Sequence, residues 1–215
     1  MANKKLIKGF YKSLFSSFGP QGWWPGRTRF EKIVGAILTQ NTNWSNVEKA
    51  IRNLKNARAL SPDGIYGLPN ERLAELIRPS GYYNIKAKRL KTFVEHLYIN
   101  HNGSLSRLFF KDTYLLRAEL LGINGIGPET ADSILLYAGA RPVFVVDAYT
   151  KRVLARHGLA GPDANYHDIQ RLFMESLAPR AVLFNEYHAL IVRVGKEFCS
   201  PREPLCGQCP LNRFL

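Results

Sequence analysis

Three glycines stand just before a helical pattern in the stretch GINGIGPETADS, at residues 122–133. Gly122, Gly125 and Gly127 allow the backbone to turn through positive φ and to approach another group closely. The first turn of the following helix leaves N–H groups unpaired and carries a partial positive charge, which favours an anion such as phosphate. A tight turn between two helices also needs glycine, so the pattern alone leaves both interpretations open.

Three carboxyl or hydroxyl side chains near this stretch could take part in chemistry. Glu129 and Thr130 lie in the first turn of the expected helix, where the helix dipole favours an acid, and this could be the whole role of Glu129. Asp147 follows the apolar segment PVFVV and directly precedes a helical pattern that begins at Ala148. Its position predicts an N-cap.

All three cysteines of the chain lie in one segment, CSPREPLCGQCPLNRFL, with the spacing C-x6-C-x2-C. This spacing is too regular for core cysteines scattered by chance. Disulfides are not expected in a cytosolic protein, so Cys199, Cys206 and Cys209 are candidate metal ligands.

The composition favours a nucleic-acid partner. The chain of 215 residues has 30 Lys and Arg against 17 Asp and Glu, a formal net charge of +13. Such a field attracts polyanions, although a basic protein without this partner, or one that binds acidic lipid, is the alternative. No apolar run approaches the roughly 20 residues of a membrane span, and the N-terminus lacks a signal-peptide core. We expect a cytoplasmic, nucleoid-associated monomer.

Helical periodicity covers most of the chain. Apolar residues recur at helical spacing from Phe30 to Leu38 and from Trp44 to Leu54, and Ser45 with Glu48 is typical of a capping box. The only strand signal is the short β-branched run at 142–146. The expected fold class is therefore all-α. Further helices are expected at residues 70–78, 85–100, 113–121, 129–139, 148–157, 166–177 and 182–197.

The order of helix, glycine hairpin, helix, extended segment and aspartate resembles the helix-hairpin-helix, glycine/proline, aspartate (HhH-GPD) superfamily of DNA glycosylases, to which endonuclease III belongs. The resemblance is strong at the hairpin and at the segments LTQNT and VVDAY. It implies that the hairpin amides hold a DNA phosphate, with Gly122, Gly125, Gly127 and Thr130 as DNA-binding residues, and that Asp147 is catalytic. It also implies two helical domains with a DNA-binding cleft between them: a six-helix domain at 24–135 that includes the hairpin, and a second domain at 1–23 plus 136–215 with the cysteine loop.

Glu129 stands where endonuclease III has a lysine that attacks the sugar C1′ to form a Schiff base. A carboxylate cannot form this imine. The resemblance, with this departure, implies a monofunctional glycosylase of base excision repair without AP-lyase activity. In such an enzyme Asp147 stabilises positive charge that develops on the sugar and helps water to attack.

The segments at 21–50 and 77–90 are similar to one branch of the superfamily, the type III 3-methyladenine DNA glycosylases. This resemblance implies that Trp24, Pro25 and Trp44 enclose the extruded base. A 3-methylated adenine is cationic, and cation–π contact contributes roughly 0.5–2 kcal/mol per ring. Core packing of the tryptophans is the alternative. Two other functions stay open: release of oxidised pyrimidines or mismatched bases, and DNA binding without catalysis.

Base flipping leaves a gap in the duplex that must be filled. The resemblance gives Gln40 and Tyr82 the roles of plug and wedge. His188 and Lys196 lie on the last long helix and are candidates to approach the base pocket, although the sequence alone does not place them. Four basic residues could contact phosphates or form a solvated helix face: Lys86, Lys88, Arg89 and Lys91.

Proteins of the endonuclease III type have a fourth cysteine five residues after the third, and the four thiolates hold a 4Fe–4S cluster. Here that position is Leu215. The resemblance implies one of two states. Either Cys199, Cys206 and Cys209 hold a cluster with a non-cysteine fourth ligand, for which the carboxylate of Leu215 stands in about the right place, or the site is degenerate and has no cluster.

Overall fold

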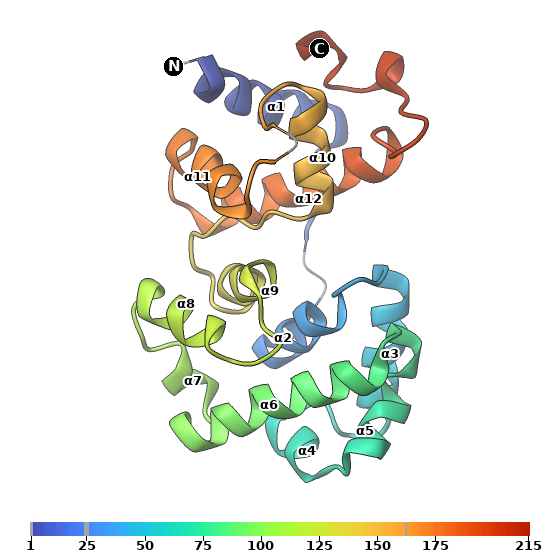
Figure 1. Ribbon diagram of the computed structural model, residues 1–215, viewed down its shortest axis with the longest axis vertical. Coiled ribbons are helices and arrows are strands. Elements are labelled where there is room, and N and C mark those ends of the chain that lie inside the picture. Colours follow the sequence, from blue (N-terminus) through green and yellow to red (C-terminus); the bar gives the residue numbers. More distant parts are fainter. Residues whose placement is uncertain (1, 24–25, 162) are drawn as a thin grey trace. The chain divides into compact units, whose positions relative to one another are not determined.

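The computed structural model describes residues 2–23, 26–161 and 163–215, and the chain divides into two compact units (Figure 1). Unit 1 comprises Met1–Trp24 and Ala140–Leu215, and unit 2 comprises Pro25–Gly139. The described residues form helices and loops and contain no β-strand, so the predicted all-α class is confirmed. Across these same residues, no helix has the length and apolar character needed to cross a membrane.

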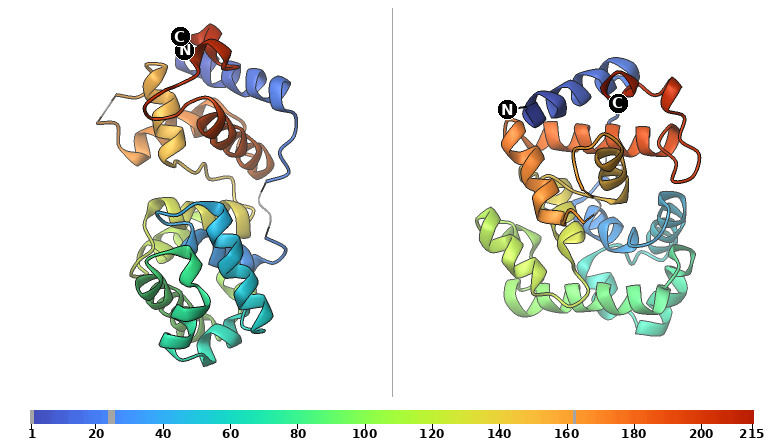
Figure 2. Two further views of the ribbon diagram at one scale, coloured as in Figure 1. Left: turned by 90° about the vertical axis from the view of Figure 1, so that its right-hand side faces the viewer. Right: turned by 45° about the horizontal axis from the view of Figure 1, so that its top comes forward.

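Unit 1 is organised around its last long helix. Its helices are α1 (Ala2–Phe18), α10 (Ala148–Arg156), α11 (Tyr166–Ser176) and α12 (Ala181–Glu197), with 3-10 turns at Cys206–Gln208 and Asn212–Phe214. Helix α12 packs against α10 and α1, and α1 also packs against α11 (Figure 2). Tyr187 of α12 is fully buried, and its hydroxyl donates to the carbonyl of Ile7 in α1 at 2.8 Å.

An extended segment, and not a strand, leads into α10. Val143–Val146 are buried, and the ring of Phe144 stacks on Phe173 of α11 with centroids 3.8 Å apart. The side-chain amide of Gln170 donates to the carbonyl of Phe144 at 2.7 Å, which provides a bond that a neighbouring strand would otherwise supply. The strand signal at 142–146 therefore reflects core packing.

Unit 2 is built around α2 (Arg29–Leu38), whose residues from Ile33 to Leu38 are all buried. This helix contacts α3 (Trp44–Asn56), α6 (Tyr83–His101), α9 (Pro128–Ser133) and the π-helical turn Ile134–Ala138 that continues α9. The other elements of unit 2 are α4 (Pro62–Gly67), α5 (Asn70–Leu76), a 3-10 turn at Arg78–Ser80, α7 (Leu105–Leu108) and α8 (Thr113–Leu121).

The helix start at Trp44 differs from its sequence-based prediction. Asn43, and not Ser45, is the N-cap of α3, and its side chain accepts from the N–H of Asn46 at 3.1 Å. Asn caps as well as Ser does and stands earlier in the chain. Glu48 accepts instead from the indole N–H of Trp44, at 2.8 Å. The predicted capping box is therefore wrong.

Candidate active site

Asp147 caps α10 in unit 1. Its Oδ1 accepts from the backbone N–H of Thr150 at 2.8 Å and from the Thr150 hydroxyl at 2.9 Å. Two bonds to one oxygen fix the carboxylate, and the N-cap expected from the sequence is confirmed. The side chain keeps 15% of its surface exposed.

His188 of α12 faces the second oxygen of this carboxylate, with its Nε2 3.5 Å from Asp147 Oδ2. The sequence left the position of His188 open. Burial acts to raise the pKa of Asp147, but His188 and the hydrogen bonds from Thr150 outweigh it and hold this pKa below its usual value. The carboxylate therefore carries its negative charge at neutral pH.

Close packing of α10 on α12 brings these two residues together. A Cβ on Gly195 would lie only 2.6 Å from the ring of Tyr149, so glycine is needed at this point of α12. Arg152 of α10 donates to the carbonyls of Cys199 and Gly195, at 2.6 and 2.9 Å. The first bond holds the segment just after α12, and the second satisfies a carbonyl in the last turn of α12 that the helix itself leaves open.

The glycine hairpin joins α8 to α9 in unit 2. Gly125 has a φ of +89°, and a Cβ there would collide with the side chain of Arg89 from α6. Gly122 is the C-cap of α8 and Gly127 the N-cap of α9, both with negative φ. Only one of the three glycines thus needs the left-handed region.

Gln40 and Thr130 brace the hairpin from within unit 2. The Gln40 amide donates to the carbonyl of Gly125 at 3.1 Å and to the Thr130 hydroxyl at 2.8 Å, and its oxygen accepts from Arg89. Thr130 is 6% exposed. Both were expected to contact DNA, but here their side chains hold the hairpin in place.

A buried ion pair joins the two helices of the hairpin, and no sequence pattern indicated it. Arg117 of α8 donates to both carboxylate oxygens of Asp132 in α9, at 2.7 and 3.0 Å. Asp132 is fully buried and the Arg117 side chain is 22% exposed. Bidentate pairing of this kind fixes orientation as well as distance.

The structure corrects the expectation that Lys86 contacts a phosphate. Its side chain is 1% exposed, and its ammonium donates to the carbonyls of Leu38 at 2.8 Å and Ser80 at 2.6 Å. Burial, with a smaller effect of Arg89, lowers the pKa of Lys86 to about 8. Lys86 therefore links α6 to the last residue of α2 and to the last residue of the 3-10 turn Arg78–Ser80. Lys88, two residues on, is exposed.

The other site residues named from the sequence lie in several places. Tyr82, before α6, is 71% exposed with a φ of 46°. Trp44 is half-buried, and Glu129 is exposed in the first turn of α9. Lys196 is exposed on α12, with its Nζ 5.9 Å from the ring centre of Trp23. Trp24 and Pro25 lie outside the described residues.

The three cysteines border one small cavity in unit 1. Cys199 is buried, Cys206 and Cys209 are partly exposed, and Arg156 donates to the sulfur of Cys199 at 3.0 Å. Burial and the neighbouring thiols raise the pKa of Cys209, against the effect of the Leu211 N–H. The residues that line the cavity are Arg156, His157, Phe198, Cys199, Cys206, Cys209, Asn212 and Leu215.

Comparisons with known proteins agree with this arrangement. The family model described as "HhH-GPD superfamily base excision DNA repair protein" matches residues 34–179. A Methanocaldococcus jannaschii protein to which a DNA repair glycosylase role is attributed is 49% identical, over 98% of this chain and 96% of its own length. The Helicobacter pylori 3-methyladenine DNA glycosylase, solved with 1,N6-ethenoadenine, is 31% identical with a TM-score of 0.78, over 91% of this chain and 97% of its own.

The fold is also that of an endonuclease III solved in a non-covalent complex with DNA. The TM-score is 0.84 at 24% identity, over 98% of this chain and 94% of the other. The family match covers more than half of the chain and includes the hairpin, the extended segment and Asp147. The chain therefore belongs to the HhH-GPD superfamily of base excision DNA repair proteins.

Proposed function

We propose that the protein is a monofunctional DNA glycosylase that hydrolyses the N-glycosidic bond of alkylated purines such as 3-methyladenine. Membership of the superfamily supports the general assignment, a DNA glycosylase of base excision repair. The finer part depends on one observation above all. A fixed, ionised carboxylate is present at Asp147, while a second carboxylate, Glu129, stands where lyases of this family have their lysine.

Asp147 would act on the charge that develops on the sugar. As the C1′–N bond breaks, its electron pair goes to the base, so a cationic 3-methyladenine leaves as a neutral molecule and the sugar becomes positive. An ionised carboxylate stabilises this positive charge. Water then forms the C1′–O bond and loses a proton, for which Asp147 is the acceptor. His188, 3.5 Å from Oδ2, holds the carboxylate in orientation.

The preference for a cationic base would depend on aromatic faces. Trp44 is half-buried at the start of α3, and Trp24, expected to face the base with it, lies outside the described residues. Aromatic rings reward a positive, electron-poor base over a neutral one. The similarity to the 3-methyladenine glycosylase of H. pylori, which extends over 91% of this chain, supports this choice.

A panel of duplexes, each with one damaged base, tests the substrate. We expect release of 3-methyladenine to be much faster than release of thymine glycol, and expect Trp44→Ala to slow the first reaction strongly without unfolding the protein. Equal release of thymine glycol would favour the second candidate, an endonuclease III-like enzyme for oxidised pyrimidines. That candidate is kept because the fold matches endonuclease III.

The absence of lyase chemistry has its own test. Treatment with borohydride traps a Schiff base between a lysine and the sugar, so we expect no covalent complex between the wild-type protein and DNA, and intact abasic sites after the reaction. A trapped complex would contradict the monofunctional proposal, and Lys196→Ala would then show whether Lys196 had formed it.

We further propose that the cysteine loop holds an iron–sulfur cluster with Cys199, Cys206 and Cys209 as ligands and a non-cysteine fourth ligand. All three thiols border one cavity, as the ligands of a single group must, and Arg156 beside Cys199 would stabilise its thiolate. A cluster would cross-link the loop and supply no step of the hydrolysis. Anaerobically purified protein should contain about four irons per chain, and Cys206→Ser should lose them. Folded, active protein without iron would favour a degenerate site.

A further inference from the structure

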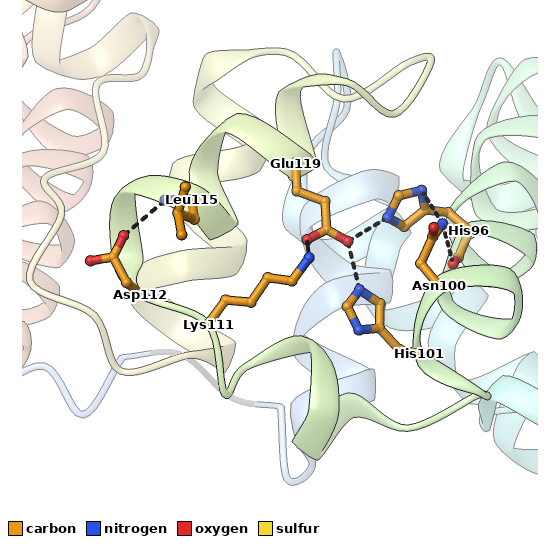
Figure 3. Close-up of polar contacts among 7 residues, drawn as sticks. All are labelled: His96, Asn100, His101, Lys111, Asp112, Leu115 and Glu119. Carbon is orange, nitrogen blue, oxygen red and sulfur yellow. Dashed lines mark hydrogen bonds and ion pairs between the residues drawn. The ribbon is translucent and has the colours of Figure 1, made fainter.

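A group of polar side chains in unit 2 lies apart from the residues assigned above (Figure 3). His96 and His101 of α6 both direct Nε2 toward the same oxygen of Glu119 in α8, with distances to Oε1 of 2.7 and 2.6 Å. The side chains of His101, Glu119 and His96 are 5, 12 and 25% exposed. The three ligand atoms all lie within 4.8 Å of one another.

We propose that His96, His101 and Glu119 bind one divalent transition-metal cation of the Zn²⁺ class. Two imidazoles and one carboxylate are a donor set that Zn²⁺ and its neighbours prefer, with further positions left for water. No cysteine takes part, so this site is chemically distinct from the cysteine loop of unit 1.

The three ligand atoms must shift to accept the cation. Bonds of about 2.0–2.1 Å in a tetrahedral site place neighbouring ligand atoms about 3.3 Å apart. The two imidazole nitrogens now lie 2.7 and 2.6 Å from Oε1, because a hydrogen is shared across each contact. A cation would replace these hydrogens and move Oε1 about 0.7 Å further from each nitrogen. The two nitrogens, which lie within 4.8 Å of each other, would come closer by up to about 1.5 Å.

Two neighbouring side chains hold the ligands in orientation. Lys111 donates to Glu119 Oε2 at 2.5 Å, which leaves Oε1 directed at the histidines (Figure 3). Asn100 contacts His96 Nδ1 at 3.2 Å and the His96 carbonyl at 3.1 Å, and so orients the ring. A cation on Nε2 would leave the imidazole proton on Nδ1, and a flip of the Asn100 amide would then place its oxygen as the acceptor that metal-binding histidines commonly have on this nitrogen. The positive charge of Lys111 would lower the affinity for a cation without blocking Oε1.

The position of the site indicates a structural role. Glu119 lies in the last turn of α8, and its backbone carbonyl accepts from the N–H of Gly122 at 3.0 Å. A cation would therefore cross-link the end of α6 to the end of α8, directly before the glycine hairpin. Binding to the folded state alone would raise the melting temperature of the protein.

Titration of Zn²⁺ into chelator-treated protein, followed by calorimetry, tests the site. The thiols also bind Zn²⁺, so wild type is compared with Cys206→Ser, which leaves the histidines untouched. We expect Cys206→Ser to bind one Zn²⁺ per chain. His101→Ala in this background should bind Zn²⁺ at least about 100-fold more weakly. Loss of a side chain that only orients a ligand typically costs about 10–100-fold in affinity, and loss of the ligand itself should cost more. His167→Ala, an exposed histidine of α11, is the matched control and should bind as Cys206→Ser does.

A second variant keeps the test decisive if His101→Ala, with its buried side chain, does not fold. His96 is 25% exposed, so His96→Asn in the Cys206→Ser background should fold and should no longer bind this Zn²⁺. In Cys206→Ser, Zn²⁺ should shift the Cε1–H NMR signals of two histidines and raise the melting temperature. Absence of a Zn²⁺ equivalent in Cys206→Ser, or its retention in His96→Asn, would overturn the proposal.

Discussion

The two units hold their buried carboxylates in different ways. In unit 2, Asp132 pairs with Arg117 at 2.7 Å and Glu31 with Lys55 at 2.6 Å, and these acid side chains are 0 and 7% exposed. In unit 1, Asp147 receives bonds from Thr150 and faces His188. Among the described residues, no lysine or arginine lies within ion-pair distance of Asp147.

This difference separates a structural carboxylate from one that can act on a substrate. A fixed guanidinium cancels most of the field of Asp132, so its charge contributes only to the position of α8 against α9. Asp147 is oriented by neutral donors and a histidine, and its charge is less cancelled at short range. Such a carboxylate can respond to a positive charge that develops on a substrate.

The largest expected effect is on chemistry. Asp147→Asn should reduce base release by about 10³-fold, or about 4 kcal/mol of transition-state stabilisation, and change affinity for an abasic-site analogue by less than about tenfold. Asn keeps the cap, so the fold should persist. Single-turnover rates and equilibrium binding measure the two quantities.

Asp112→Asn provides the matched control, because Asp112 also caps a helix, with its Oδ1 3.0 Å from the N–H of Leu115. This exposed residue should tolerate the change with full activity. Full turnover in Asp147→Asn would contradict a catalytic role for Asp147. Equal loss of activity in Asp147→Asn and Asp112→Asn would mean that Asp147 does not differ from an ordinary helix cap.

The next effect is on stability. Arg117→Met removes the bidentate ion pair between Arg117 and the buried Asp132, and the free energy of unfolding should fall by about 3 kcal/mol. Arg72→Met removes the same side chain from an exposed pair with Glu75 and should change stability by less than about 1 kcal/mol. Urea denaturation of both variants measures the difference. Similar small losses would mean that the Arg117 pair is not structural.

Sequence patterns predicted the long helices from α2 onward because each has an apolar stripe, and they predicted the cap at Asp147 because a helical run begins directly after it. The helices α4 and α7, with 6 and 4 residues, are too short to show a period and were not predicted. Lys86 was predicted wrongly as a phosphate contact, although it stands four residues before the buried Leu90 and so in phase with the apolar face.

The ion pair and the histidine cluster had no signal in the sequence. Arg117 and Asp132 are 15 residues apart, and His96 and Glu119 are 23 apart, so only the folded hairpin and the packing of α6 on its neighbours bring them together. Helical periodicity reports which face is buried, but it does not report which polar groups meet across two helices.

Lys86 provides a third test, through pH. Its pKa falls from 10.5 to about 8 on folding, so between these pH values the folded state binds fewer protons than the unfolded state. Stability should therefore rise with pH across this window, by up to roughly 3 kcal/mol, and the cost of the buried charge should be fully present below pH 8. Lys86→Met should lack this rise, whereas Lys88→Met should keep it. Parallel pH profiles for wild type and Lys86→Met would show that Lys86 keeps its ordinary pKa.

The smallest expected effect tests whether Gln40 braces the hairpin or enters the DNA. Its amide donates to Gly125 and Thr130, and each such bond contributes about 1 kcal/mol. If these bonds hold the hairpin in place, and the hairpin contacts DNA as we expect, Gln40→Ala should weaken binding about 3- to 10-fold, equally for intact and damaged duplexes, and leave the rate of base release from bound DNA unchanged. If Gln40 leaves the hairpin and fills the gap after base flipping, binding to intact DNA should stay the same while base release slows. Fluorescence anisotropy on both duplexes, with single-turnover rates, distinguishes the two. A slower rate without loss of affinity would place Gln40 with Asp147 as a residue of the reaction.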